Sequence, residues 1–196
     1  MVNKLITHDQ IKGHLFDGMT ILVGGFMTVG TPLGVVEAII ESGVKDLTLV
    51  CNDAGYEDKG IGKIINNGQC KTLITSHIGL NPDAQAKMTS GELEIILTPQ
   101  GTLAEQLRAG GSGLGGVLTP TGVGTLVAEG KEVINIDGKD FLLEKAIKGD
   151  LAIVKSNVSD KKGNSKLLGT TINFNTVMSL AANTVIVEAD EIKEHV

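Results

Sequence analysis

Short apolar runs alternate with helix-like segments along the first half of the chain, and this alternation limits the fold more than any other feature. Residues 20–23 form an almost wholly apolar run, which is typical of a strand buried on both faces. Pro32 precedes a helical pattern that Gly43 is suited to end, and residues 47–50 form a second apolar run. Strand, helix and strand within about 30 residues predict a βαβ unit.

The alternation continues as far as residue 108. Asn81 and Pro82 predict a helix start, with Asn as the cap and Pro at the first helical position. The sequence therefore predicts an α/β fold with an open, mostly parallel sheet flanked by helices, and its 196 residues suit one domain, 1–196. The further elements expected in this half are a short helix at 61–65, strands at 73–75 and 93–97, and a helix at 102–108.

The second half of the chain is less regular. Residues 110–124 are rich in Gly, Thr and Pro, and we expect a long loop there of the kind that is usually functional. Asp137-Gly138 between two alternating runs predicts an inserted β-hairpin. We further expect strands at 151–154 and 184–187, a polar turn at 160–164 and a helix at 176–182.

Composition excludes several classes of protein. The net charge of −6 and the 3% of aromatic residues argue against nucleic-acid binding. No apolar run reaches the roughly 18 residues of a membrane span, and residues 1–10 lack the apolar core of a signal peptide. Cys51 and Cys70 lie in or beside apolar runs and are expected to be buried thiols. The sequence predicts a soluble, cytoplasmic protein.

A glycine-rich turn follows the first strand and is the strongest candidate for a binding site. Gly24, Gly25 and Phe26 come where a strand passes to a helix, and ligands of open α/β sheets bind at such carboxyl ends. The helix start after Pro32 is expected to offer free N–H groups to an anion. The alternative is a turn whose glycines only allow the helix to pack on the sheet.

Other motifs carry less weight. Gly111, Gly113 and Gly116 form a GxGxxG pattern, but a helix-like segment precedes it, whereas a dinucleotide site needs a strand there. The four histidines show no spacing of metal ligands, so no metal is expected.

Polar side chains lie at the predicted carboxyl ends of two strands. Asn52 and Asp53 follow the second strand, where they either bind a ligand or hold a turn. Gln100 follows Pro99 at the end of another strand, and its amide is a donor that stays neutral at any pH. Such a donor stabilises a developing oxyanion, or alternatively caps the helix that follows.

These motifs resemble those of family I CoA-transferases, of the 3-oxoacid type, and the resemblance is greatest to the α subunits of acetate/butyrate–acetoacetate enzymes. It covers nearly the whole chain in the family's order. The matching stretches are 17–32, 91–105, 108–125 and 173–175.

The resemblance implies a role for the chain in CoA transfer between short-chain acyl-CoA and acetoacetate or another small acid. In this family a glutamate of a separate β subunit forms a glutamyl-CoA thioester, so this chain is expected to lack the nucleophile. The resemblance assigns Gln100 to the oxyanion hole and Gly24, Gly25, Phe26 and Asn52 to the acyl side of the site. It also implies coenzyme A as a substrate, no other cofactor, a β-subunit partner and an α2β2 assembly.

The chain departs from the family pattern in three places. Asp53 replaces an Asn found in many relatives and adds a possible negative charge near anionic substrates. Ile172 replaces an Arg, so any anion contact from that Arg is expected to be lost. The chain ends at Val196, short of the usual family length, so a tail segment is expected to be missing.

Two other functions compete with the transferase. A related fold serves in sugar-phosphate sensors, so a non-catalytic ligand-binding module is the alternative. A one-chain isomerase or hydrolase would need an acid–base pair at the strand ends, and the sequence offers no convincing one.

Overall fold

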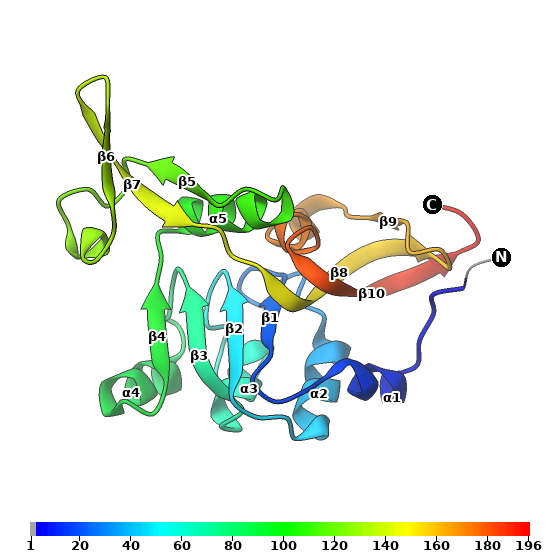
Figure 1. Ribbon diagram of the computed structural model, residues 1–196. Coiled ribbons are helices and arrows are strands. Elements are labelled where there is room, and N and C mark those ends of the chain that lie inside the picture. Colours follow the sequence, from blue (N-terminus) through cyan, green and yellow to red (C-terminus); the bar gives the residue numbers. More distant parts are fainter. Residues whose placement is uncertain (1–2) are drawn as a thin grey trace.

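A seven-stranded sheet forms the centre of the protein in the computed structural model, which describes residues 3–196 (Figure 1). Residues 1 and 2, the first of the residues 1–10 that are predicted to form no signal peptide, lie outside the described residues. The strands of the seven-stranded sheet follow the order β10-β8-β1-β2-β3-β4, all parallel to their neighbours, and β9 pairs antiparallel with β8. We call this the large sheet. Its strands are β1 (Thr20–Val23), β2 (Leu47–Cys51), β3 (Cys70–Thr75), β4 (Glu94–Leu97), β8 (Gly149–Asp160), β9 (Ser165–Lys166) and β10 (Ala182–Lys193).

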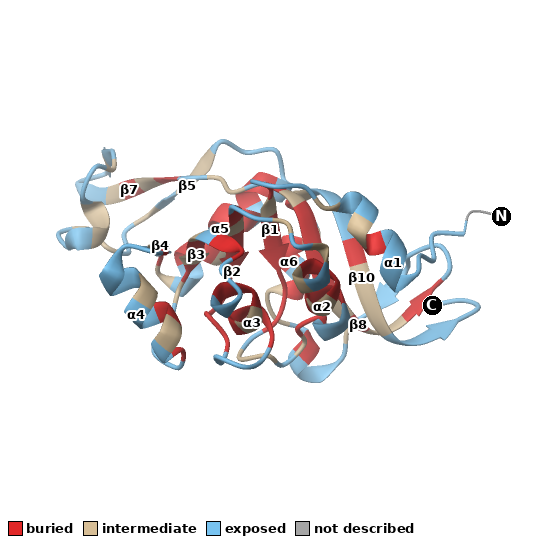
Figure 2. Cartoon of the chain, turned by 90° about the horizontal axis from the view of Figure 1, so that it is seen from below, coloured by how far each residue is buried: buried red, intermediate tan, exposed pale blue. Residues whose placement is uncertain are grey.

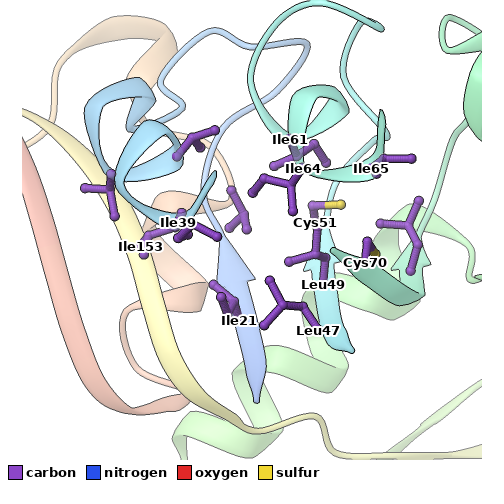
Figure 3. Close-up of a cluster of buried hydrophobic side chains, with 14 of the residues drawn as sticks. Ile21, Ile39, Leu47, Leu49, Cys51, Ile61, Ile64, Ile65, Cys70 and Ile153 are labelled. Atoms are coloured by element: carbon purple, nitrogen blue, oxygen red, sulfur yellow. The ribbon is translucent and has the colours of Figure 1, made fainter. Parts of the chain in front are cut away.

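Helices cover both faces of the large sheet. Successive side chains of a strand point to opposite faces, so the buried strands pack against helices on both sides. Leu49 and Cys51 point toward α2 and α3, where they join Ile61 in one core cluster (Figure 3). Leu22 and Val50 point the other way and pack with α5 and α6 in a second cluster. The helices are α1 (His8–Ile11), α2 (Leu33–Ser42), α3 (Ile61–Asn66), α4 (Pro82–Ser90), α5 (Gln100–Gly111) and α6 (Asn175–Met178), with 3-10 turns at Lys12–His14, Leu126–Ala128 and Gly169–Thr171.

The predicted start of α4 and the predicted end of α2 are confirmed by their caps. The Asn81 side chain accepts a hydrogen bond from the backbone N–H of Ala84, with Pro82 at the first helical position of α4. Gly43 ends α2 with φ of 71°, a left-handed conformation that costs glycine little. No helix among residues 3–196 is long and apolar enough to cross a membrane.

A second, three-stranded antiparallel sheet projects beside α5, and we call it the small sheet (Figure 1). It has the order β5-β7-β6, with β5 (Gly116–Thr119), β6 (Val133–Ile136) and β7 (Lys139–Lys145). The turn between β6 and β7 is formed by Asp137 and Gly138, both at positive φ. The predicted hairpin is therefore confirmed.

The predicted loop at 110–124 is only partly correct. Helix α5 continues through Gly110 and Gly111, where a Cβ would overlap the Ile147 carbonyl and the Leu180 backbone. These glycines let the helix approach its neighbours closely. Strand β5 forms because it pairs with β7, which lies more than 20 residues further along the chain. Local patterns do not reveal such a distant pairing.

Other boundaries also differ from the sequence prediction. Helix α5 begins at Gln100 rather than at residue 102, and α6 ends at Met178 rather than at residue 182. Strands β8 and β10 are much longer than the apolar runs inside them, since they pair with each other as far as Asp160 and Lys193. Backbone pairing sustains both strands where their side chains become polar.

Candidate active site

A tight turn follows β1 and carries the first group of predicted site residues. Phe26 and Val29 exchange two backbone hydrogen bonds of 3.0 and 2.8 Å, with Met27 and Thr28 between them at φ of 47° and 68°. Left-handed backbone costs a non-glycine residue about 1–2 kcal/mol. The surrounding structure must therefore hold this turn in place.

Asn175 is one residue that holds the turn. Its side-chain amide donates to the Gly30 carbonyl at 2.9 Å, and its Oδ1 accepts from the Lys155 backbone at 3.0 Å. A Cβ at Gly24 would overlap that oxygen, so Gly24 is required by close packing. Asn175 belongs to the stretch 173–175 that resembles the family, but no local pattern indicates its role.

Asp53 holds the same turn from the other side. Its Oδ2 accepts from the Met27 backbone N–H at 2.9 Å and from the Asn52 amide at 2.8 Å, while its Oδ1 accepts from the Gly55 N–H at 2.9 Å. The residue is only 6% exposed. Of the two alternatives left open by the sequence, Asp53 therefore holds a turn, and its carboxylate is engaged by protein donors rather than open to an anionic substrate.

Asn52 links this turn to Gln100. Its Oδ1 accepts from the Gln100 side-chain amide at 2.6 Å, so residues 48 positions apart meet where β2 and β4 end. Asn52 is buried, whereas Gln100 is exposed. The Gln100 amide has two N–H groups and gives one to Asn52, which leaves the other for a ligand.

The start of α2 differs from the sequence expectation. The Val35 N–H donates to a carboxylate oxygen of Glu188, at 3.1 Å, and Glu188 also pairs with Lys155. Glu188 lies on β10, far away in sequence, so no local pattern indicates that it reaches this helix. The helix start is thus occupied by a protein carboxylate, and the expected anion site there is not supported.

Ionisation and metal binding offer no further chemistry beside the turn. Burial raises the pKa of the Cys51 thiol well above its usual range, and the nearby Asp53 carboxylate adds to the effect. The thiol is therefore protonated at neutral pH and a poor nucleophile. Among the described residues, 3–196, no group of His, Cys, Asp and Glu is placed to hold a metal ion.

The predicted site residues come together at one edge of the large sheet, where β1 to β4 end. We call it the carboxyl edge; in Figure 1 the arrowheads of these strands point to it. Gly24, Gly25, Phe26 and Asn52 line one small hollow. Gln100 is not one of its lining residues, but its side chain donates a hydrogen bond to Asn52, which is. Within the part of the chain that the structure describes, Asp53 is the one carboxylate that lines this hollow.

An open parallel sheet with a glycine turn and an amide pair at its carboxyl edge defines a ligand-binding α/β protein. Residues 6–195 match the family model described as Coenzyme A transferase, and the chain belongs to this family.

Named relatives narrow the comparison. The chain is 51% identical to the acetate CoA-transferase subunit alpha of Escherichia coli K12, over 99% of this chain and 88% of that protein. It is 48% identical to the acetoacetyl-CoA:acetate/butyrate CoA transferase alpha subunit of Clostridium acetobutylicum, over 98% and 88%. The crystal structure of glutaconate coenzyme A-transferase from Acidaminococcus fermentans shares the fold with a TM-score of 0.83 at 19% identity, over 95% of this chain and 66% of that one.

Proposed function

We propose that this chain is the alpha subunit of a heteromeric CoA-transferase that moves CoA between a short-chain acyl-CoA and acetoacetate or another small acid. Relatives at 48–51% identity with these names support the assignment. Coenzyme A is a substrate of the reaction, and no other cofactor is proposed.

The proposed reaction uses a glutamate of a β subunit as nucleophile. Its carboxylate attacks the acyl-CoA carbonyl, which gives an acyl–glutamyl anhydride and frees the CoA thiolate. The thiolate then attacks the glutamyl carbonyl, and the donor acid leaves as a carboxylate. A glutamyl-CoA thioester remains, and the acceptor acid takes up CoA by the same steps in reverse.

The observation that carries the proposal is the exposed Gln100 amide, held at the carboxyl edge by its 2.6 Å bond to Asn52. Each step of the reaction places negative charge on a carbonyl oxygen, and a fixed neutral donor stabilises that charge. We propose Gln100 as the oxyanion donor. Because Asp53 is engaged by three N–H groups, residues 3–196 offer no free carboxylate at the hollow to act as the nucleophile.

The glycine turn suits a substrate-binding role. Gly24 and Gly25 line the hollow with their backbone, and the space that a Cβ would fill is taken by Asn175 and Thr31 rather than left for a ligand. Phe26 is about half exposed beside them. We propose that these residues and Asn52 form the wall against which the acyl group lies.

The remaining parts of the proposal concern assembly and location. We propose a single domain over 1–196, a β-subunit partner, an α2β2 assembly and a cytoplasmic protein. The names of the relatives, which call them alpha subunits, support the partner. The acidic net charge and low aromatic content support a role without nucleic acid or membrane.

The test is Gln100→Ala in the complex with the cognate β chain. We expect kcat to fall by about 100- to 1000-fold, as for loss of one oxyanion donor. The matched control is Gln85→Ala, since Gln85 is an exposed glutamine like Gln100. It lies on α4 and donates to backbone carbonyls instead of to Asn52. Unchanged kcat in Gln100→Ala would overturn the assignment of Gln100.

A second experiment tests the division of labour between the chains. Borohydride reduction of the enzyme incubated with acyl-CoA should mark the β chain alone. A mark on this chain would contradict the proposal. A sugar-phosphate sensor would instead bind a phosphosugar tightly and be indifferent to Gln100→Ala, and the occupied start of α2 argues against that reading.

A further inference from the structure

We infer that Asp53 is a positioning residue, which sets the direction of the hydrogen bonds through Asn52 so that Gln100 presents an N–H, and not its carbonyl oxygen, to the site. This inference rests on the proposed function and names a further residue for it. The three side chains form one continuous row of hydrogen bonds, from Asp53 to Asn52 and from Asn52 to Gln100.

The row has one end that cannot be reversed. A carboxylate accepts hydrogen bonds and donates none, whereas an amide side chain can face either way. Asp53 Oδ2 accepts from the Met27 N–H at 2.9 Å. The same oxygen lies 2.8 Å from the Asn52 amide, from which it can only accept a second hydrogen bond. Asn52 must therefore direct its NH₂ group to Asp53.

The direction then passes to Gln100. When the NH₂ group of Asn52 faces Asp53, only its carbonyl oxygen is left for Gln100. Gln100 therefore donates from its own NH₂ group to that oxygen, at 2.6 Å. If the Asn52 amide were reversed, its NH₂ group would face Gln100. Gln100 would then turn its carbonyl oxygen toward Asn52 to accept that hydrogen bond. The oxyanion site would lose its oriented donor without the loss of any side chain.

Burial keeps water from taking over this task. Asn52 is 2% exposed and Asp53 is 6% exposed, so their partners come from the protein. A buried polar group without a partner is costly, which penalises the reversed arrangement while Asp53 is present. The same carboxylate also holds Met27 in the strained turn, so Asp53 connects the glycine wall to the donor.

The experiment compares Asp53→Ala and Asp53→Asn in the complex with the cognate β chain. Alanine removes the acceptor, and we expect kcat to fall by about 10- to 100-fold, less than for removal of the Gln100 donor itself. Asparagine keeps one carbonyl oxygen, which the Met27 N–H holds in the place of Oδ2, so the direction of the hydrogen bonds is kept. Its NH₂ group then faces the Gly55 N–H, so we expect a lower melting temperature while kcat stays within about 5-fold of the wild type. Equal losses in the two variants would overturn the inference.

A double-mutant cycle separates positioning from general stability. If Asp53 acts through Gln100, then Asp53→Ala should change kcat by less than about 2-fold in a Gln100→Ala background, because coupled residues are not additive. An additive loss would show that Asp53 only supports the fold. If the alanine subunit does not fold, Asp53→Ser replaces it, since a hydroxyl both donates and accepts and no longer imposes a direction.

Asp160 provides a matched control. It is also buried, and it accepts two backbone N–H groups and one Asn side chain: those of Lys162 and Asn164, and the Asn164 amide. Asp160→Ala should lower the melting temperature while kcat stays within about 2-fold. A loss of kcat as large as that of Asp53→Ala would contradict the inference. If the wild-type complex transfers no CoA at all, the proposed function fails instead.

Discussion

The large sheet and the small sheet are stabilised in different ways. Nearly every residue of β1 and β2 is buried, whereas Leu142 and Glu144 alone are buried in the three strands of the small sheet (Figure 2). Buried apolar surface stabilises the first by about 25 cal/mol per Å². The second depends on backbone pairing and a few polar contacts. The proposed chemistry lies at the ends of β1, β2 and β4 of the large sheet, and β1 and β2 are the well buried strands among these.

A buried carboxylate ties the small sheet to the helix that begins with Gln100. Glu144 on β7 is 3% exposed and accepts from the Gln106 amide of α5 at 3.2 Å. Its other oxygen accepts from Lys131 at 2.7 Å. Helix α5 thus joins the two sheets, with the proposed oxyanion donor at its start.

The largest expected effect concerns the cores. Leu49→Ala removes a fully buried side chain of β2 and should lower the free energy of unfolding by about 2–5 kcal/mol. Leu118→Ala in β5, where the side chain is 39% exposed, should cost clearly less. Urea unfolding followed by circular dichroism measures both. Equal losses would show that the two sheets do not differ as their burial suggests.

An intermediate effect is expected from Glu144→Ala. The change leaves Gln106 and Lys131 without their acceptor, which should cost about 1–3 kcal/mol. Amide hydrogen exchange should quicken in β5, β6 and β7, while β1 and β2 keep their protection. Asp140→Ala is the control, since Asp140 is an exposed carboxylate of the same strand. Faster exchange throughout the large sheet would mean that the two sheets open together.

At neutral pH the two buried thiols should have the smallest effect, because their contribution to stability changes only under alkaline conditions. Burial raises the pKa of Cys70 from 9.0 to about 12, and both thiols lie in the large sheet. The unfolded chain loses these protons first, so stability is full below pH 9 and falls as the pH rises toward 12. The expected slope is about 1.4 kcal/mol per pH unit for each thiol, so the change is small near pH 9 and grows as the pH rises. Cys70→Ala should reduce the slope of unfolding free energy against pH, and an unchanged slope would contradict the assignment.

The sequence predicts the first half of the fold better than the second. Residues 20–108 are built from local βαβ units, in which the apolar period and the caps at Asn81 and Gly43 suffice. The pairing of β5 with β7 and of β8 with β10 depends on partners distant in sequence. For that reason the predicted loop at 110–124 is only partly correct, and both long strands extend beyond their predicted ranges.

The site shows the same division between local and distant information. Strand ends placed Asn52 and Gln100 at one edge, and the structure brings them within hydrogen-bonding distance. The roles of Asp53, Asn175 and Glu188 could not be predicted, because each depends on which backbone groups the side chain reaches. The predicted roles of five residues, as substrate contacts or as the oxyanion donor, stay predictions: Gly24, Gly25, Phe26, Asn52 and Gln100.

The cap that Glu188 gives to α2 has a consequence for synthesis. The carboxylate and the Val35 N–H that it accepts are 153 positions apart, and Asn175 reaches Gly30 across 145. A nascent chain that has emerged only as far as β4 has neither contact, so the glycine turn cannot yet adopt its final form. Closing such long loops is slow in entropic terms. Substrate binding should therefore appear only after β10 has been translated, and a ribosome-stalled fragment ending before β8 should not bind acyl-CoA.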